Sequence, residues 1–239
     1  MDPDAPRADK ARPRPEARRL WASLKQGKDG VVEQVAEEMQ HRDPGGEKTA
    51  VCVMDGEQAL KTRAVKYLQR AFPALILVLD VIHVVEYLWK AAYAFHEPES
   101  EDARLWVRQR LLRLLNGEVS LVARGMRQSA TKQGLSPKER DPVDVACRYF
   151  LKNKDRMRYH EYLAKGLPIA SGAAEGACGH LVKDRMEITG ATWNVDEDGA
   201  EAVLRIRSVD KSGDWEEYWK FHMEQERKRL YGQQWEAVA

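Results

Sequence analysis

Three carboxylates are the residues of this sequence whose types and positions best suit chemistry. Asp55 follows an apolar run at 51–54, Asp80 follows a second run at 74–79, and Glu175 lies in a segment rich in Gly and Ala at 172–179. Apolar runs of this length are typical of buried strands, and in open α/β sheets ligands bind at the carboxyl ends of the strands. The two Asp residues therefore mark a candidate active site, which Glu175 completes if the fold brings it near.

Each Asp also has a purely structural interpretation. Asp55 precedes Gly56 and suits a turn, whereas Asp80 suits the N-cap of the helix that follows it. His83 lies one helical turn after Asp80, with Glu86 on the same face. A lone histidine at such a position is more often a structural hydrogen-bonding group than a ligand, so these residues alone leave both interpretations open.

The residues around Glu175 favour a functional role for this side chain over a role in packing. Its small neighbours let a backbone approach another helix or a ligand phosphate closely. The same predicted helix then carries the basic residues His180, Lys183 and Arg185. A polar side chain in such surroundings is unusual for a helix that only packs, so we expect this segment to contribute to a site.

A strand, a helix, a second strand and a second helix are predicted to position the two Asp residues. The run at 74–79 is typical of a strand buried on both faces of a parallel sheet. Apolar side chains recur at helical spacing over 58–71 and 81–95, and Pro73 ends the first of these helices. If the strands are parallel neighbours, Asp55 and Asp80 lie at the same edge of the sheet.

Residues 100–165 are predicted to form an all-helical insertion in this α/β chain. Ser100 is an N-cap candidate, and Ser136 begins a capping box with Glu139. The apolar spacing predicts helices that end near residues 115, 129, 152 and 164. The insertion is rich in Arg and Lys, and this surface is either a solvated helix face or a nucleic-acid-binding surface.

The flanking segments complete the predicted organisation. Residues 1–16 suit a disordered tail, and 17–41 suit two amphipathic helices that dock on the sheet. Helices are also expected at 173–186, at 199–209 and after Asp214 as a cap, with Trp215 and Trp219 in the core. We divide the chain into a tail with docking helices (1–47), the first part of the core (48–99), the insertion (100–165) and the end of the core with the Glu175 helix and the C-terminal helices (166–239).

Composition limits the classes of protein to which this chain can belong. A net charge of +1 and 32% charged residues predict a soluble protein, and no run reaches the roughly 18 apolar residues of a membrane span. No secretory signal pattern opens the chain. Three scattered cysteines predict reduced thiols in a cytoplasm, and no His or Cys pair has the spacing of a structural zinc site.

The motifs around these residues resemble those of DDE transposases from bacterial insertion sequences of the ISKra type. The matching motifs are VMDGE at 53–57, LDVIHVVEYLW at 79–89, GLPIASG at 166–172, EGAC at 175–178, VKDRM at 182–186, GAEAVL at 199–204 and GDWEEYW at 213–219. The resemblance extends from about residue 12 to residue 231. It implies a ribonuclease H-like α/β core with an all-helical insertion, similar in plan to Mutator-like transposases.

The resemblance also implies a chemistry. Such enzymes cleave and transfer DNA strands with two Mg²⁺ ions, roughly 3.5–4 Å apart, held by carboxylates. Asp55 corresponds to the second catalytic Asp, Asp80 and His83 to the family's x-x-His motif, and Glu175 to the catalytic Glu, with Asp55 and Glu175 as metal ligands. We expect a homo-oligomer on the element ends and target DNA in a bacterial cytoplasm, with no membrane association. The expected DNA-binding residues are Arg124, Arg127, Lys132, Lys183 and Arg185.

This sequence departs from the family in one respect. The first catalytic Asp of such enzymes lies on an upstream strand, and no strand-like run ending in Asp precedes residue 51. We therefore expect an N-terminally truncated transposase that lacks the first core strands and does not cut DNA by itself. Two alternatives remain. One is a ribonuclease H-like nuclease that works with Asp55, Asp80 and Glu175, and the other is a non-catalytic remnant that binds DNA or regulates another subunit.

Overall fold

The computed structural model describes residues 16–172, 176, 181, 182, 184 and 197–232. The chain divides into two compact units, Lys28–Gly172 and the combination of Met1–Gly27 with Ala173–Ala239. The described residues are mostly helical and include one small parallel sheet, so the predicted mixed α/β class is correct at this level. Within them, no helix has the length and apolar character needed to cross a membrane.

The sheet of the first unit consists of two parallel strands. β1 (Val51–Met54) pairs with β2 (Ile76–Leu79), with Met54 opposite Leu79 in the last pair. The crossover between them is α2 (Gln58–Arg63), which continues as the π-helical segment η1 (Ala64–Gln69). A helical crossover is the usual connection between parallel strands. The predicted order of strand and helix is confirmed, although β2 begins two residues later than expected.

Helices cover both faces of this sheet, because side chains alternate along β1. Val51 and Val53 pack against an apolar cluster formed with the later helices of the unit. Cys52 and Met54 belong to a second cluster, with side chains from α2, η1 and α1 (Gly27–Arg42). The second strand is also apolar on both faces, as the unbroken hydrophobic run at 74–79 predicted.

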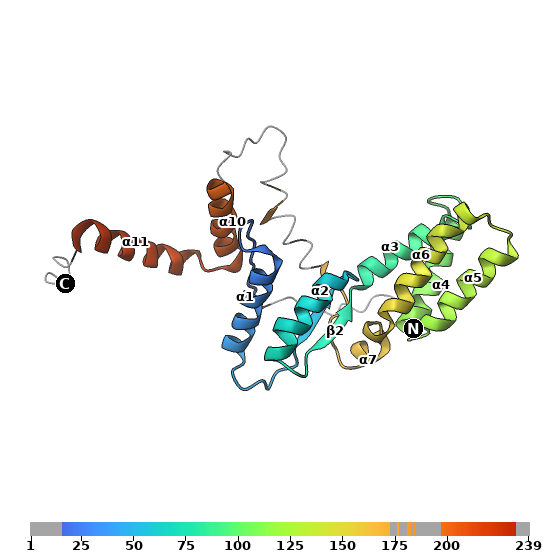
Figure 1. Cartoon of the computed structure of the whole chain (residues 1–239), viewed down its shortest axis with the longest axis horizontal. Helices are drawn as coiled ribbons and strands as arrows, with labels where there is room; N and C mark the ends of the chain where they lie inside the picture. The colour runs from blue at the N-terminus through green and yellow to red at the C-terminus, as the bar shows by residue number, and fades with distance from the viewer. Residues whose placement is uncertain (1–15, 173–175, 177–180, 183, 185–196, 233–239) are drawn as a thin grey trace, which may run out of the picture. The chain divides into compact units, whose positions relative to one another are not determined.

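The predicted helices of residues 100–165 are present within the first unit. They comprise α4 (Glu101–Leu115), α5 (Val119–Lys132), α6 (Pro137–Asn153), the 3₁₀ turn η2 (Lys154–Arg156) and α7 (Tyr159–Ala164). Helices α4 and α6 lie alongside α3 (Val81–Ala92), which leaves the sheet, and α5 packs against α4 and α6 (Figure 1). The Ser100 hydroxyl accepts a hydrogen bond from the Ala103 N–H at 3.2 Å, and Ser136 and Glu139 form the predicted capping box.

The end of the insertion returns to the outer edge of β2. The Tyr159 hydroxyl donates to the Leu79 carbonyl at 2.9 Å, and the Tyr162 hydroxyl donates to the Leu77 carbonyl at 3.5 Å. One residue beyond the strand's closing Asp80, the Val81 N–H donates to the Ile169 carbonyl at 3.0 Å. Two β2 carbonyls that point away from β1 are therefore satisfied by α7, and the first amide of α3 is satisfied by the segment that follows the insertion.

The second unit contains α10 (Glu197–Ser212), α11 (Trp215–Tyr231) and the irregular segment before α1. The buried Glu201 carboxylate accepts hydrogen bonds from the Ser23 hydroxyl at 2.8 Å and from the Leu24 N–H at 2.7 Å. Burial raises the pKa of Glu201, but Arg205 and these two donors outweigh it and lower the pKa to about 2. Residues 16–26 do not form the first of the two docking helices that we expected, so that prediction is wrong. Hydrogen bonds to the Glu201 side chain hold this segment in place.

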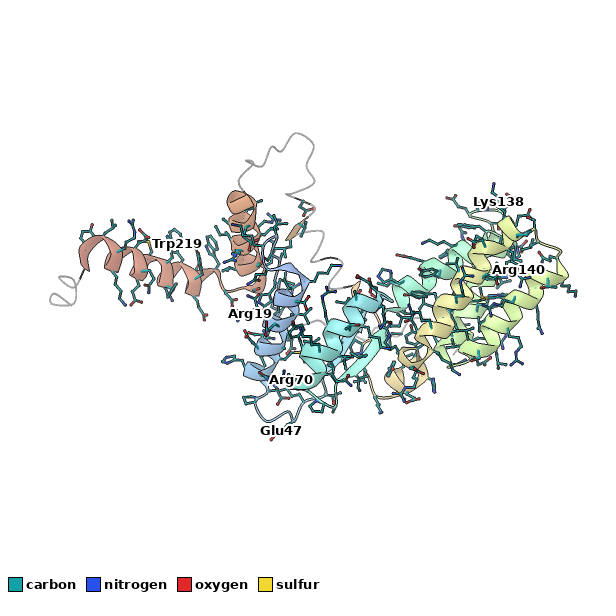
Figure 2. All side chains as sticks on the ribbon, in the orientation of Figure 1. Arg19, Glu47, Arg70, Lys138, Arg140 and Trp219 are labelled. Atoms are coloured by element: carbon teal, nitrogen blue, oxygen red, sulfur yellow. The ribbon has the colours of Figure 1, made fainter. Side chains whose placement is uncertain are left out.

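Two expectations for the last helix are also wrong. Asp214 occupies the N-cap position of α11, but its side chain does not cap the helix and instead forms an ion pair with Arg19 at 2.6 Å. Trp215 and Trp219 stack with ring centroids 6.1 Å apart, yet they are 40% and 48% exposed. Trp219 is labelled on α11 in Figure 2. Among the described residues these rings therefore contribute to a surface and not to the core.

Candidate functional site

Asp55 and Asp80 occupy neighbouring positions at the carboxyl edge of the sheet. Each directly follows a residue of the last paired position, Met54 in β1 and Leu79 in β2. The Asp80 N–H donates to the Met54 carbonyl at 2.8 Å, which extends the strand pairing up to this residue. The predicted placement of these two residues at the same sheet edge is confirmed.

Asp55 keeps part of its carboxylate available. Its Oδ1 accepts a hydrogen bond from the Glu57 N–H at 2.8 Å, a local turn that leads into α2. The other carboxylate oxygen accepts no hydrogen bond from any residue that the structure describes, and the side chain is partly exposed. Asp55 can therefore bind a ligand at the sheet edge without losing its structural hydrogen bond.

Asp80 uses both carboxylate oxygens inside the protein. The residue is only 1% exposed, and its Oδ1 accepts from the Ile82 N–H at 2.9 Å, as an N-cap does. Its Oδ2 accepts from the Ser171 N–H at 3.2 Å and from the Ser171 hydroxyl. This geometry favours the structural interpretation of Asp80, because a metal ion would have to displace these donors to reach the carboxylate.

His83 lies on the surface of α3, away from these hydrogen bonds. Its Nδ1 is 3.4 Å from a carboxylate oxygen of Glu86, one turn further along the helix. Within the described part of the chain, His83 has no hydrogen bond to Asp55 or Asp80. The x-x-His spacing thus places this ring beside Glu86 and does not add a third group to the pair of Asp residues.

A buried arginine, Arg156, supports the turn at Asp55. In the sequence it belongs to the basic residues of the insertion, which gave no sign of this contact. Arg156 is 4% exposed and donates from Nη1 to the backbone carbonyl of Asp55 at 3.1 Å, while Nη2 donates to the Asn153 side chain. Its Nε is buried without a hydrogen-bond partner in the described structure. Burial lowers the pKa of Arg156, although the nearby Tyr149 and Asp55 counter this effect.

Tyr149 closes the other side of the same turn. Its ring stacks on Tyr87 with centroids 4.0 Å apart, and a Cβ added at Gly56 would lie only 2.2 Å from the Tyr149 ring. Burial, together with nearby Tyr87 and Asp55, raises the pKa of Tyr149 to about 12. Glycine is therefore required after Asp55 by this close approach, which the Asp-Gly pair alone did not reveal.

The third predicted carboxylate, Glu175, lies outside the described residues, as do Lys183 and Arg185. Among the residues that are described, no three His, Cys, Asp or Glu side chains are grouped to hold a metal ion. Asp55 offers one free carboxylate oxygen and Asp80 offers none, so the described residues supply a single ligand and do not by themselves fit a two-metal site.

The predicted DNA-binding residues of the insertion lie along α5. Arg124 and Lys132 are exposed, whereas Arg127 forms an ion pair with Asp144 of α6 at 3.3 Å. Asp144 also pairs with Arg140 at 2.8 Å, and Arg140, labelled in Figure 2, donates to the Thr131 hydroxyl of α5 at 3.0 Å. Arg127 is thus partly neutralised, since it shares the single carboxylate of Asp144 with Arg140.

Comparison with known protein families, curated proteins and solved structures gives no match for this chain. The family resemblance therefore stays a prediction from the sequence motifs.

Proposed function

We propose that this chain is a transposase-type protein that acts on DNA, and that β1, β2 and their helices belong to a ribonuclease H-like core. The observation that carries the proposal is the position of Asp55. It ends a parallel strand at the carboxyl edge of the sheet, with one free carboxylate oxygen, and an all-helical insertion follows in the chain. These features accompany the motifs that resemble DDE transposases.

In this proposal Asp55 and Glu175 are the residues that would hold Mg²⁺. The metal, when bound, neutralises charge on the oxygens of a phosphodiester. Asp80 then has a positioning role, since it starts α3 and anchors Ser171, four residues before Glu175 in the sequence. Arg156 holds the backbone of Asp55 and leaves its carboxylate free.

The test is Mg²⁺-dependent nicking of supercoiled plasmid DNA. We expect no nicking by the chain as given, because the resemblance implies three carboxylates and assigns only Asp55 and Glu175 here. Nicking should appear when an upstream segment with a strand-borne Asp is supplied. In that protein Asp55→Asn and Glu175→Gln should each abolish cleavage without loss of DNA binding, and Asp80→Asn should act more weakly. Nicking by the chain as given, with Asp80→Asn as damaging as Asp55→Asn, would instead support the nuclease alternative.

A DNA-binding protein without catalysis is the second candidate, and the engaged carboxylate of Asp80 favours it. Here the insertion would bind DNA phosphates through exposed cations such as Arg124 and Lys132 of α5. Binding to phosphates weakens with salt, with a log–log slope of about −0.9 for each phosphate neutralised. Salt-independent binding, or binding unchanged by reversing the charges of Arg124, Arg127 and Lys132, would show a plain solvated surface. Assembly of several copies on DNA in a bacterial cytoplasm belongs to both proposals.

A further inference from the structure

A groove between α4 and α5 is lined by positive and hydrogen-bonding side chains. It has a volume of about 420 Å³, and Arg110 and Arg113 enter it from α4 while Lys132 enters it from α5. Its other polar side chains are Gln109, Gln128 and Ser129, so none of the lining residues is Asp or Glu. The groove therefore presents donors and positive charge without a carboxylate of its own.

Arg110 is held in a fixed place in this groove. Its guanidinium carbon lies 3.8 Å from the centroid of the Trp106 ring, and its Nη1 donates to the Trp106 carbonyl at 3.1 Å. Such cation–π contacts position a guanidinium without neutralising its charge. Burial, together with the neighbouring Arg113, lowers the pKa of Arg110 to about 10. A bound anion would offset both unfavourable influences.

The remaining cations differ in how far they are neutralised. Arg113 forms an ion pair with Glu118 at 2.7 Å, at the connection between the two helices. Arg110 and Lys132 have no carboxylate partner among the described residues. These two side chains, one from each helix, therefore carry the net positive charge of the groove.

Gly125 leaves the wall of the groove open. It lies inside α5, where Gly is less favourable than Ala by about 1 kcal/mol. A Cβ added at this position would meet no atom within 4 Å, so neither turn geometry nor close packing in the described structure requires glycine here. Its effect is to leave this part of the groove wall without a side chain.

The groove on the opposite side of α5 has a different character. It has a volume of about 600 Å³ and is lined by Arg124 and Arg127 together with the apolar side chain of Leu151. Arg127 is partly neutralised there, because it shares the Asp144 carboxylate with Arg140. Gln128 and Lys132 line both grooves, so positive charge continues across the outer face of α5 from Arg110 to Arg124.

We propose that the groove between α4 and α5 binds a phosphate group of the DNA backbone, with Arg110 and Lys132 as its two cationic donors. The inference rests on the proposed function in DNA binding, and it adds Arg110 and a defined groove to Lys132, which the sequence analysis already assigned to DNA binding. The continuity of charge across α5 favours a polyanion that extends beyond one groove over a small free anion.

The test is fluorescence anisotropy of a labelled duplex of random sequence, titrated with the full chain at several NaCl concentrations. Arg110→Gln and Lys132→Gln should each weaken binding and reduce the magnitude of the log–log salt slope, by at most about 0.9, because the two side chains bind the same phosphate. Arg108→Gln is the matched control, since Arg108 is an exposed arginine of the same helix that does not line the groove. It should leave the slope of the unmodified chain unchanged.

Gln109→Glu provides a second variant that keeps Arg110 and its contact with Trp106. Gln109 is exposed and lines only this groove, so the added carboxylate should weaken DNA binding without affecting the fold. Far-UV circular dichroism checks the fold of each variant. Normal salt slopes for Arg110→Gln and Gln109→Glu, with DNA binding by the unmodified chain intact, would overturn the phosphate site and leave the proposed function standing.

Two further outcomes separate the sources of phosphate. If the unmodified chain does not bind the duplex at any salt concentration, both the proposed function and the DNA phosphate site are overturned. Calorimetric titration with inorganic phosphate alone then shows whether the groove holds a free anion. Binding of inorganic phosphate that is lost in Arg110→Gln, with no binding of DNA, would assign the groove to a free phosphate and likewise overturn the proposal for DNA.

Discussion

The ends of β1 and β2 hold the same residue type at neighbouring positions, yet the two regions are built in opposite ways. At the end of β1, Arg156 supports Asp55 through its backbone carbonyl, and the carboxylate keeps a free oxygen. At the end of β2, the carboxylate of Asp80 itself holds Ser171 and the start of α3. Support through the backbone leaves a side chain available for a ligand, whereas support through the side chain consumes it.

The largest expected effect is at Asp80. Asp80→Ala removes the N-cap of α3 and leaves the partly buried donors of Ser171 without this acceptor, so we expect a loss of about 2–4 kcal/mol in the free energy of unfolding. Asp80→Asn, which keeps one acceptor oxygen, should lose less. Urea denaturation measures both variants. A loss below about 0.5 kcal/mol in Asp80→Ala would contradict a structural role for this carboxylate.

Gly56→Ala should have the next largest effect, about 1–3 kcal/mol, because the new methyl group overlaps the Tyr149 ring. A double-mutant cycle with Tyr149→Ala measures how much of this loss comes from the Tyr149 ring, since truncation of the ring removes the overlap. In the Tyr149→Ala background, the unfolding free energy should be nearly insensitive to Gly56→Ala. Equal costs in the two backgrounds would show that another contact requires the glycine.

Arg156→Met should cost less, about 1–2 kcal/mol, because it removes the donors to the Asp55 carbonyl and to Asn153 but also removes a buried Nε without a partner. The substitution should destabilise the Asp55 turn more than it destabilises the rest of the protein. The Glu57 amide donates a hydrogen bond to Asp55, so its hydrogen-exchange rate should increase in Arg156→Met by a larger factor than the rates of amides in α5. Unchanged exchange at Glu57 would show that Arg156 does not hold this turn.

The smallest effect on stability is expected for Asp55→Asn, within about 0.5 kcal/mol, because the asparagine oxygen can still accept from the Glu57 N–H. Thermal unfolding followed by circular dichroism measures the change against the unmodified chain. A loss as large as that of Asp80→Ala would mean that the Asp55 carboxylate is structural too, and the contrast between the two strand ends would disappear.

The sequence predicted the parallel strands, their order and the position of both Asp residues, because an unbroken apolar run and an Asp-Gly pair are local features. It also predicted the caps at Ser100 and Ser136 for the same reason. The partner of Asp80 could not be predicted, since Ser171 lies 91 residues away in the sequence and nothing local marks the contact.

The degree of exposure of individual polar and aromatic residues could not be predicted from the sequence either. Arg156 belongs to a run of basic residues in the sequence, and its contact with Asp55 spans 101 positions. The spacing of Trp215 and Trp219 gave the correct helix but the wrong environment, because periodicity shows which side chains share a face and does not show what covers that face. The expected helix before α1 failed because Ser23 and Glu201 hold this segment through tertiary contacts.

The tyrosine hydroxyls of α7 that bind β2 affect how the sheets of two copies could pair through their edge strands. Tyr159 and Tyr162 bind the outward carbonyls of Leu79 and Leu77, so a strand that joins on that side would have to displace these hydroxyls. No described strand pairs with the opposite side of β1. A sheet with one blocked side and one side open to pairing can associate once and then stop. We therefore expect strand pairing between two copies to close as a dimer through β1 and not to propagate into a fibre.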